Sequence, residues 1–163
     1  MPWAWISVGS NLDREASVRG AVAAMRRRFG DLRLSSVYES TAVGSDGPPF
    51  LNLVAGFASE AGVAALNAWL RATEDAFGRI RGRDRFAPRT LDLDLLTYGE
   101  RVGVVDGCRL PRDEILRYAF VLAPLAEVDP DGRHPENGRR YRELWAEFPK
   151  DRPPLVRIPF AFD

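Results

Sequence analysis

The chain contains very little cysteine and histidine, and each shortage excludes a kind of site. Cys108 is the only cysteine among 163 residues, which excludes an internal disulfide framework and a metal site built from several cysteines. His134 is the only histidine and lies in a turn-like stretch with glycine, proline and asparagine. We therefore interpret His134 as structural or solvated, and expect neither a histidine general base nor a histidine-based zinc site.

An excess of charge of either sign is also lacking. Lysine and arginine together number 23, as do aspartate and glutamate, so the formal net charge is zero. Such a chain has no overall field to recruit nucleic acid or an acidic membrane, and we expect neither as a partner. Lys150 is the only lysine. Because codon bias can produce such a composition, the use of arginine rather than lysine is weak evidence on its own.

Long apolar runs are missing as well. No stretch is long enough to span a bilayer, and the opening residues lack the charged start and long apolar core of a signal peptide. These absences predict a cytoplasmic protein. A chain of 163 residues with 45% hydrophobic content is most simply one domain, residues 1–163, around one core. We take it to be a monomer that acts on small molecules.

The hydrophobic periodicity predicts an α+β protein. Strand-like patterns cover residues 3–8, 32–39, 51–57 and 91–96, and helical patterns run from about Asp13 to Gly30 and from Val63 to Gly78. The order β-α-β-β-α-β is the ferredoxin-like split βαβ sandwich, with two helices packed on one face of an antiparallel sheet. Additional C-terminal helices are predicted at 118–128 and 141–148.

The most informative segment of the chain is a strand with strict alternation. Leu91, Leu93 and Leu95 share one face, whereas Asp92 and Asp94 share the other. The two carboxylates therefore lie roughly 7 Å apart along the strand. A carboxylate pair completed by substrate phosphate oxygens is a common way to bind Mg²⁺.

An isolated D-x-D pattern is more often the solvated face of a strand. Three features favour a metal site here. The strand is hydrophobic and we expect it to be central, where two like charges are unfavourable without a cation. Glu74 on the preceding helix adds negative charge. A loop rich in arginine comes just before the strand, with arginines at 79, 81, 83, 85 and 89.

Two or three of those arginines are plausible phosphate ligands, since a triphosphate needs several charges neutralised. The chain has no G-x-x-x-x-G-K-[ST] motif, so any nucleotide is held without a P-loop.

The segment from Arg85 to Asp94, RFAPRTLDLD, resembles the signature R-W-x-P-R-x-x-D-x-D of the 6-hydroxymethyl-7,8-dihydropterin pyrophosphokinase family of folate biosynthesis. Further ordered matches lie at residues 8–12, 50–52 and 120–125. The family fold is a ferredoxin-like sandwich, in agreement with the element order above. The resemblance implies a transferase of the kinase type that moves diphosphate from ATP to the pterin hydroxymethyl group and releases AMP.

The resemblance also implies the site residues. Asp92 and Asp94 would hold two Mg²⁺ ions and act in catalysis together with Arg81 and Arg89. The positions expected around the nucleotide are Glu74, Arg79, Arg81, Phe86, Arg89, Leu95, Cys108, Arg109, Leu110, Arg112, Arg117 and Tyr118. The positions expected around the pterin are Gly9, Ser40, Val43, Phe50, Asn52, Phe86, Asp92 and Phe120, with Phe50 and Phe120 stacking on the two faces of the ring.

The chain departs from the family pattern at four positions. Arg112 stands where a histidine is common, and Tyr118 where an arginine is common, with Arg117 one residue earlier. Phe50 replaces a frequent tyrosine, and Phe86 a tryptophan. Because arginine does not exchange a proton near neutral pH, any proton-transfer role of the histidine is lost.

Three alternatives stay open from the residues. One is a divergent paralogue that works slowly or on a modified pterin. Another is a different two-metal nucleotide enzyme on a ferredoxin-like core. The third is an RNA-binding module of the same topology, but the strand at 51–57 lacks the basic and exposed aromatic residues that such a module needs.

Overall fold

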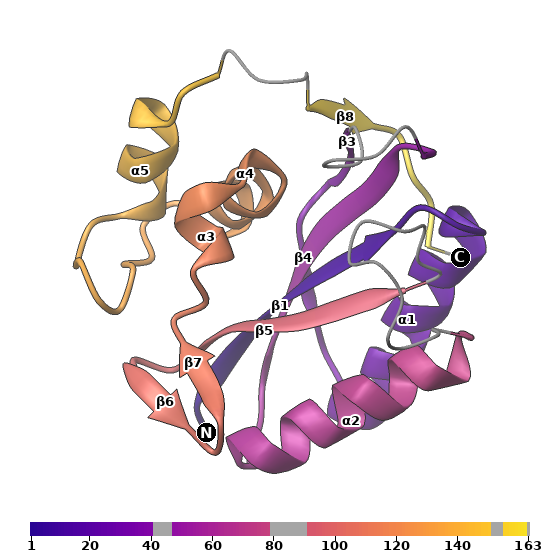
Figure 1. The fold of residues 1–163 in the computed structure, drawn as a ribbon, viewed down its shortest axis with the longest axis horizontal. Helices are drawn as coiled ribbons and strands as arrows, with labels where there is room; N and C mark the ends of the chain where they lie inside the picture. The colour runs from indigo at the N-terminus through magenta and orange to yellow at the C-terminus, as the bar shows by residue number, and fades with distance from the viewer. Residues whose placement is uncertain (41–46, 79–90, 151–154, 163) are drawn as a thin grey trace.

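The computed structural model describes residues 1–40, 47–78, 91–150 and 155–162 (Figure 1). The elements are, in chain order, β1 (Trp3–Ser10), α1 (Arg14–Phe29), β2 (Arg33–Leu34), β3 (Val37–Ser40), β4 (Phe50–Ala58), α2 (Val63–Ala76), β5 (Asp92–Tyr98), β6 (Gly103–Val105), β7 (Cys108–Leu110), α3 (Glu114–Arg117), α4 (Ala119–Val128), α5 (Tyr141–Glu147) and β8 (Val156–Ile158).

The main sheet has the strand order β5-β1-β4-β3-β8, and β2 also pairs with β4. Every pairing is antiparallel. This is the predicted split βαβ arrangement, because β1, β4, β3 and β5 occupy the four positions of the ferredoxin-like sheet. Helices α1 and α2 lie on one side of the sheet, and α3, α4 and α5 lie on the other (Figure 1).

The face towards α1 and α2 holds the larger core. Alternate residues of the central strands point into it, because successive side chains of a strand alternate between faces. Leu53, Phe57 and Leu93 are fully buried there, and Val22 and Leu70 cover them from α1 and α2. We call this the leucine face.

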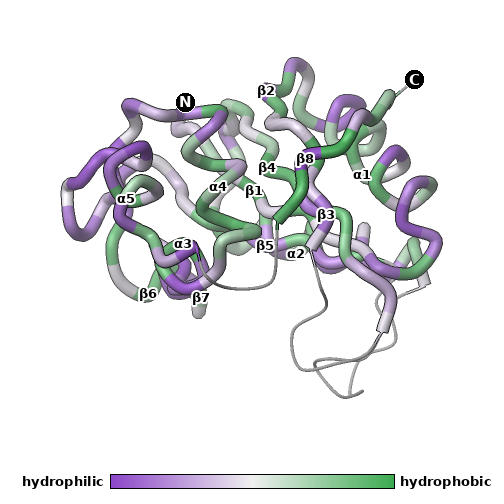
Figure 2. The backbone as a smooth tube through the Cα atoms, turned by 90° about the horizontal axis from the view of Figure 1, so that it is seen from above, coloured by the Kyte–Doolittle hydropathy of each residue, from purple (hydrophilic) through white to green (hydrophobic). Residues whose placement is uncertain are grey.

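The opposite face carries a second, smaller core under α4. Trp5, Val54 and Leu96 form its floor on the sheet, and Val121 and Leu125 cover it from α4. Helix α4 is largely hydrophobic along the tube of Figure 2. We call this side of the sheet the α4 face.

Three predictions about secondary structure need correction. β5 was expected to be central but lies at the end of the sheet order. The single strand expected at 32–39 is two short strands, β2 and β3, because Ser35 interrupts the ladder, its backbone N–H donating to Val54 O and its hydroxyl accepting from Val54 N. The hairpin of β6 and β7, helix α3 and strand β8 were not predicted.

Within the described residues, no helix is both long enough and apolar enough to cross a membrane. His134 is 2% exposed, and its Nδ1 accepts hydrogen bonds from the backbone N–H groups of Glu136 and Asn137. Burial lowers the pKa of His134. These contacts support a structural role for His134.

Candidate active site

One end of the α4 face gathers the polar residues of four strands. Gly9 on β1 lies directly between Asn52 on β4 and Asp92 on β5, and Ser7 lies opposite Asp94. Asn52 in turn pairs with Tyr38 on β3. Because these residues share one parity of the pleat, their side chains leave the sheet on the same side. The same face that carries the apolar core under α4 thus becomes polar towards β5.

Gly9 makes room for two predicted pterin positions. A Cβ built on Gly9 would lie 3.2 Å from Asn52 Oδ1 and 3.7 Å from Phe50 Cδ1. A side chain there would crowd Asn52 and touch Phe50. Asn52 is 3% exposed, and its Nδ2 donates a 2.7 Å hydrogen bond to Ser40 Oγ. The structure therefore brings together Gly9, Ser40, Phe50 and Asn52, four of the positions expected around the pterin.

Asp94 faces two guanidinium groups. Arg112 Nη2 lies 3.2 Å from Asp94 Oδ1, and Arg71 Nη2 lies 3.8 Å from the same oxygen. Arg112 also forms an ion pair through its Nε with Glu114. The Asp94 side chain is 20% exposed, so one carboxylate oxygen meets two cations at the edge of solvent. Of the predicted nucleotide positions, Arg112 is thus placed directly against the carboxylate pair.

The electrostatics of Asp94 are unusual for a carboxylate beside two arginines. Burial and the neighbouring charge of Asp92 raise the pKa of Asp94 to about 7, although Arg112 and Arg71 act in the opposite direction. The arginines therefore do not fully compensate the two negative charges. A cation with a higher charge density would compensate them better.

Glu74 anchors the strand that carries the aspartates. Its carboxylate is fully buried and accepts a 2.7 Å hydrogen bond from the backbone N–H of Leu93. Arg71, one turn earlier on α2, forms a 3.3 Å ion pair with Glu74 and donates to the carbonyl of Leu93. Both backbone groups of Leu93 lie on the outer edge of β5, which would otherwise be open. These contacts make Glu74 a positioning residue for Asp92 and Asp94.

Arg71 was missed by the sequence reasoning. Its spacing of three residues from Glu74 places both on one side of α2, and this is the signal that would have identified it.

A stack of three side chains stands at the start of α4. The Arg117 guanidinium lies 5.5 Å from the centre of the Tyr118 ring, which in turn stacks on Phe120 with ring centres 5.0 Å apart. Phe120 also packs against the core under α4. Tyr118, which stands where the family has arginine, therefore packs against Phe120, the predicted pterin-stacking residue. Arg117 lies beside the ring of Tyr118.

The remaining predicted nucleotide positions lie on β5, at Leu95, and on β7, from Cys108 to Leu110. Leu95 and Leu110 are fully buried in the core of the leucine face, so only their backbone is available to a ligand. Cys108 is half-buried, and the exposed Arg109 forms a 3.3 Å ion pair with Glu136. Five predicted positions lie outside the described residues: Val43, Arg79, Arg81, Phe86 and Arg89.

Asp92 and Asp94 fit a magnesium ion in part. Within residues 1–40, 47–78, 91–150 and 155–162, no three carboxylate, histidine or cysteine groups are close enough to form a metal cage. Two carboxylates alone suit Mg²⁺, which usually keeps waters and takes further oxygens from substrate phosphates. The repulsion between Asp92 and Asp94 also favours a cation bound between them.

Comparison with known proteins decides the family. Residues 5–130 match the family described as 7,8-dihydro-6-hydroxymethylpterin-pyrophosphokinase, or HPPK. The chain belongs to this family. A 2-amino-4-hydroxy-6-hydroxymethyldihydropteridine pyrophosphokinase of Pseudomonas aeruginosa is 37% identical over 96% of this chain and 97% of its own length. An enzyme of the same description from Synechocystis sp. is 35% identical over 85% of this chain and 70% of its own length.

The fold agrees with HPPK structures. A solved Plasmodium falciparum HPPK-DHPS chain matches with a TM-score of 0.72 over 90% of this chain. The present chain spans 41% of the length of that solved chain, and the two are 11% identical, so this likeness concerns the fold alone.

Membership of the HPPK family gives the chain its reaction. It is a pyrophosphokinase of folate biosynthesis, with ATP as co-substrate and 6-hydroxymethyl-7,8-dihydropterin as acceptor of the diphosphate.

Proposed function

We propose that Asp92 and Asp94 together hold two Mg²⁺ ions while this HPPK transfers diphosphate to its pterin and releases AMP. The observation that supports this most is the uncompensated charge of the pair, because the pKa of Asp94 is raised by burial and by Asp92 even with two arginines nearby. Bound there, the metal would neutralise phosphate charge and help activate the attacking hydroxyl, as in other two-metal displacements.

We assign the pterin to the polar end of the α4 face. Asn52 is buried and held by Ser40, so its amide is oriented before a ligand arrives. Such an amide can read the hydrogen-bonding edge of a flat heterocycle. Phe50 beside it and Phe120 on α4 are the two rings that would contact the pterin faces.

Arg112 takes the role of a phosphate ligand in this proposal. Its guanidinium lies against Asp94, where it is half-buried and shared with Glu114. When a metal neutralises Asp94, the attraction that holds Arg112 there weakens, and a phosphate oxygen is the alternative partner. Arginine binds phosphate well but moves no proton near neutral pH, so Arg112 positions and neutralises without acting as an acid.

The test measures AMP from ATP with 6-hydroxymethyl-7,8-dihydropterin, in the presence and absence of Mg²⁺. Counting Mn²⁺ by electron paramagnetic resonance, with a non-hydrolysable ATP analogue, then gives the number of ions. We expect pterin-dependent AMP and two Mn²⁺ ions per chain. A single bound ion in a turning-over enzyme would contradict the two-metal assignment but leave the reaction standing. An unchanged affinity of Mg²⁺-nucleotide in Arg112→Ala would contradict the role given to Arg112.

We also propose that the protein acts as a cytoplasmic monomer. Light scattering at micromolar concentration tests the oligomeric state, and a mass of twice 18.2 kDa would contradict it.

A further inference from the structure

A hollow lies between α4, α5 and the strands β3 and β8, and its Tyr38 is the strand neighbour of Asn52. Its volume is about 530 Å³, within the range of small-molecule sites. The lining residues are Tyr38, Ala119, Ala123, Ala126, Glu127, Arg142, Trp145, Pro149, Lys150, Leu155 and Arg157. None of them belongs to the predicted nucleotide or pterin positions. The reaction assigned above therefore leaves this cavity without a role.

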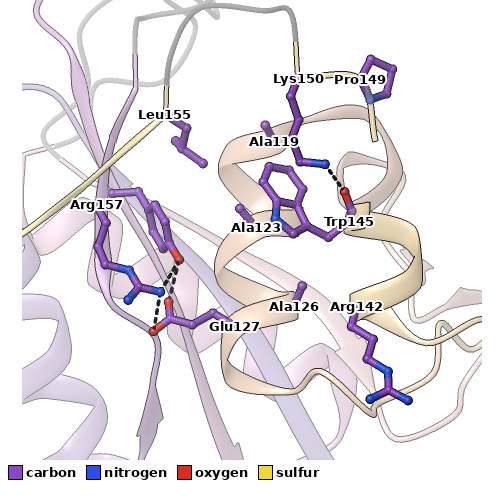
Figure 3. Close-up of a pocket in the computed structure, with 11 residues that line it drawn as sticks. Ala119, Ala123, Ala126, Glu127, Arg142, Trp145, Pro149, Lys150, Leu155 and Arg157 are labelled. Carbon is purple, nitrogen blue, oxygen red and sulfur yellow. Dashed lines mark hydrogen bonds and ion pairs between the residues drawn. The ribbon is translucent and has the colours of Figure 1, made fainter. Parts of the chain in front are cut away.

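The wall formed by α4 is flat and apolar. Ala119, Ala123 and Ala126 lie on one side of that helix, since they are spaced by four and three residues. Their methyl groups project towards the cavity beside the indole of Trp145, whereas Arg157 lies across from them on β8 and Glu127 extends from α4 towards it (Figure 3). Small side chains on one wall and a large ring beside them leave a slot suited to a planar group.

The acid that lines the cavity is already engaged. The Glu127 carboxylate accepts hydrogen bonds from Ser36 N at 3.0 Å, Ser36 Oγ at 2.7 Å and Tyr38 Oη at 2.8 Å. It also forms a 3.6 Å ion pair with Arg157. Glu127 thus fixes α4 against β3, and its charge is compensated within the protein.

The cations of the lining outnumber this single acid. Lys150 donates to the carbonyl of Trp145 at 2.6 Å, and its Nζ lies 4.5 Å from the Trp145 ring centre (Figure 3). These contacts hold an ammonium group at the edge of the cavity, over the indole. Arg142 pairs with Asp131 at 3.3 Å, but both side chains are more than half exposed, so the pair is weak. The cavity therefore combines an apolar slot with a positive rim.

We propose that this cavity is a second binding site, separate from the site of diphosphate transfer, and that it takes a small planar aromatic carboxylate. The ring would enter between the alanine wall and Tyr38, next to Trp145. The carboxylate would stay at the rim, where Arg157 supplies donors. Lys150, whose ammonium already donates to the carbonyls of Trp145, Ala146 and Phe148, would supply positive charge. A neutral ring of the same shape would gain the apolar contacts but not the charge.

The probe is 2-naphthoate, with 2-naphthamide as its neutral match, measured by titration calorimetry on the full chain. We expect 2-naphthoate to bind in the range of about 0.1–1 mM and the amide roughly tenfold more weakly. No heat with 2-naphthoate up to several times that range, roughly 5 mM, would overturn the proposal. Equal affinities of the two compounds would overturn the anionic class of the ligand.

Two variants locate the binding. Ala123→Leu fills the slot and should abolish binding of 2-naphthoate, whereas Lys150→Gln should weaken it roughly threefold to tenfold. Arg101→Gln removes an exposed cation elsewhere and should change nothing. If Ala123→Leu lowers the melting temperature, the result of Lys150→Gln stands by itself, because that side chain is exposed. Unchanged binding in Lys150→Gln would overturn the proposal.

A competition arm separates this site from the pterin site. We expect 2-naphthoate to bind equally well when the pterin and a non-hydrolysable ATP analogue are saturating. Displacement of 2-naphthoate by the pterin would mean that the probe occupies the active site, and the second site would then be refuted.

Discussion

The two faces of β5 serve different purposes with alternate residues of one strand. Leu93 and Leu95 are fully buried in the core of the leucine face, whereas Asp92 and Asp94 leave the opposite face, where Asp94 meets two arginines at the edge of solvent. The leucines stabilise the fold, and the unfavourable proximity of the carboxylates is tolerated on a strand held by those leucines. Because the period is two residues, each face can be altered separately.

The largest expected effect is on catalysis, from a change to a carboxylate on the α4 face. Asp94→Asn should lower the rate of AMP formation by roughly a thousandfold or more, because it removes a metal-binding oxygen. The same change should leave the metal-free fold as stable as before, or more stable at pH 8, since it relieves repulsion with Asp92. Quenched-flow assays and urea unfolding measure the two quantities. Turnover near that of the wild type would refute the metal assignment.

The next largest effect is expected on the stability of the protein, from a change on the leucine face. Leu93→Ala should reduce the free energy of unfolding by about 2–5 kcal/mol, because the side chain is fully buried between the sheet and two helices. Urea denaturation followed by circular dichroism measures it. Mg²⁺-nucleotide affinity of the folded fraction should stay close to that of the wild type. A loss of affinity as large as in Asp94→Asn would show that the two faces are not separable.

Glu74 connects the two faces, since it lies buried beside the strand and binds the backbone of Leu93. Glu74→Ala should cost about 3 kcal/mol of stability, because it leaves Arg71 without this carboxylate and removes the acceptor for Leu93 N–H. Glu74→Gln should cost less, since an amide oxygen still accepts that hydrogen bond. Glu60→Gln, at an exposed position shortly before α2, is the control. Equal losses in the alanine and glutamine variants would mean that the charge alone matters.

The smallest effect is a dependence on pH. The pKa of Asp94 in the folded protein, about 7, lies above its ordinary value, so between those values the folded state binds a proton that the unfolded state releases. Without divalent ions, the Asp94 contribution to stability should therefore be present at low pH and lost as the pH rises through 7. We expect the difference between wild type and Asp94→Asn to change by roughly 1–3 kcal/mol from pH 4 to pH 8 in urea unfolding. A constant difference across this range would contradict the raised pKa.

The sequence was sufficient for the elements with strong periodicity. Strand β4, helix α2 and the alternation in β5 follow from the spacing of apolar residues, and the carboxylate pair follows from the same alternation. The position of β5 at the sheet edge could not be predicted, because the hydrophobic sequence of this strand is typical of a central strand. Glu74 and Arg71 bind the edge backbone of β5 at Leu93, but both residues are charged, so no hydrophobic pattern in the sequence indicates this contact.

Long-range pairing explains why strand β8 was not predicted. Strand β8 is only three residues long, and its partner β3 lies more than a hundred residues earlier, so no local pattern predicts it. The stack of Arg117, Tyr118 and Phe120 was equally hidden, because the substitution at Tyr118 acts through packing on Phe120 rather than through charge. In the sequence, Tyr118 is visible only as a departure from the family pattern.

The pairing of β8 with β3 has a practical consequence for handling the protein. Val156 to Ile158 occupy the free edge of β3, and Ala161 accepts a 2.7 Å hydrogen bond from Arg19 on α1. Removing residues 155–162 would expose the backbone donors and acceptors of β3 to other molecules. A shortened chain would therefore be prone to edge-to-edge association during concentration or crystallisation, even with its active site intact.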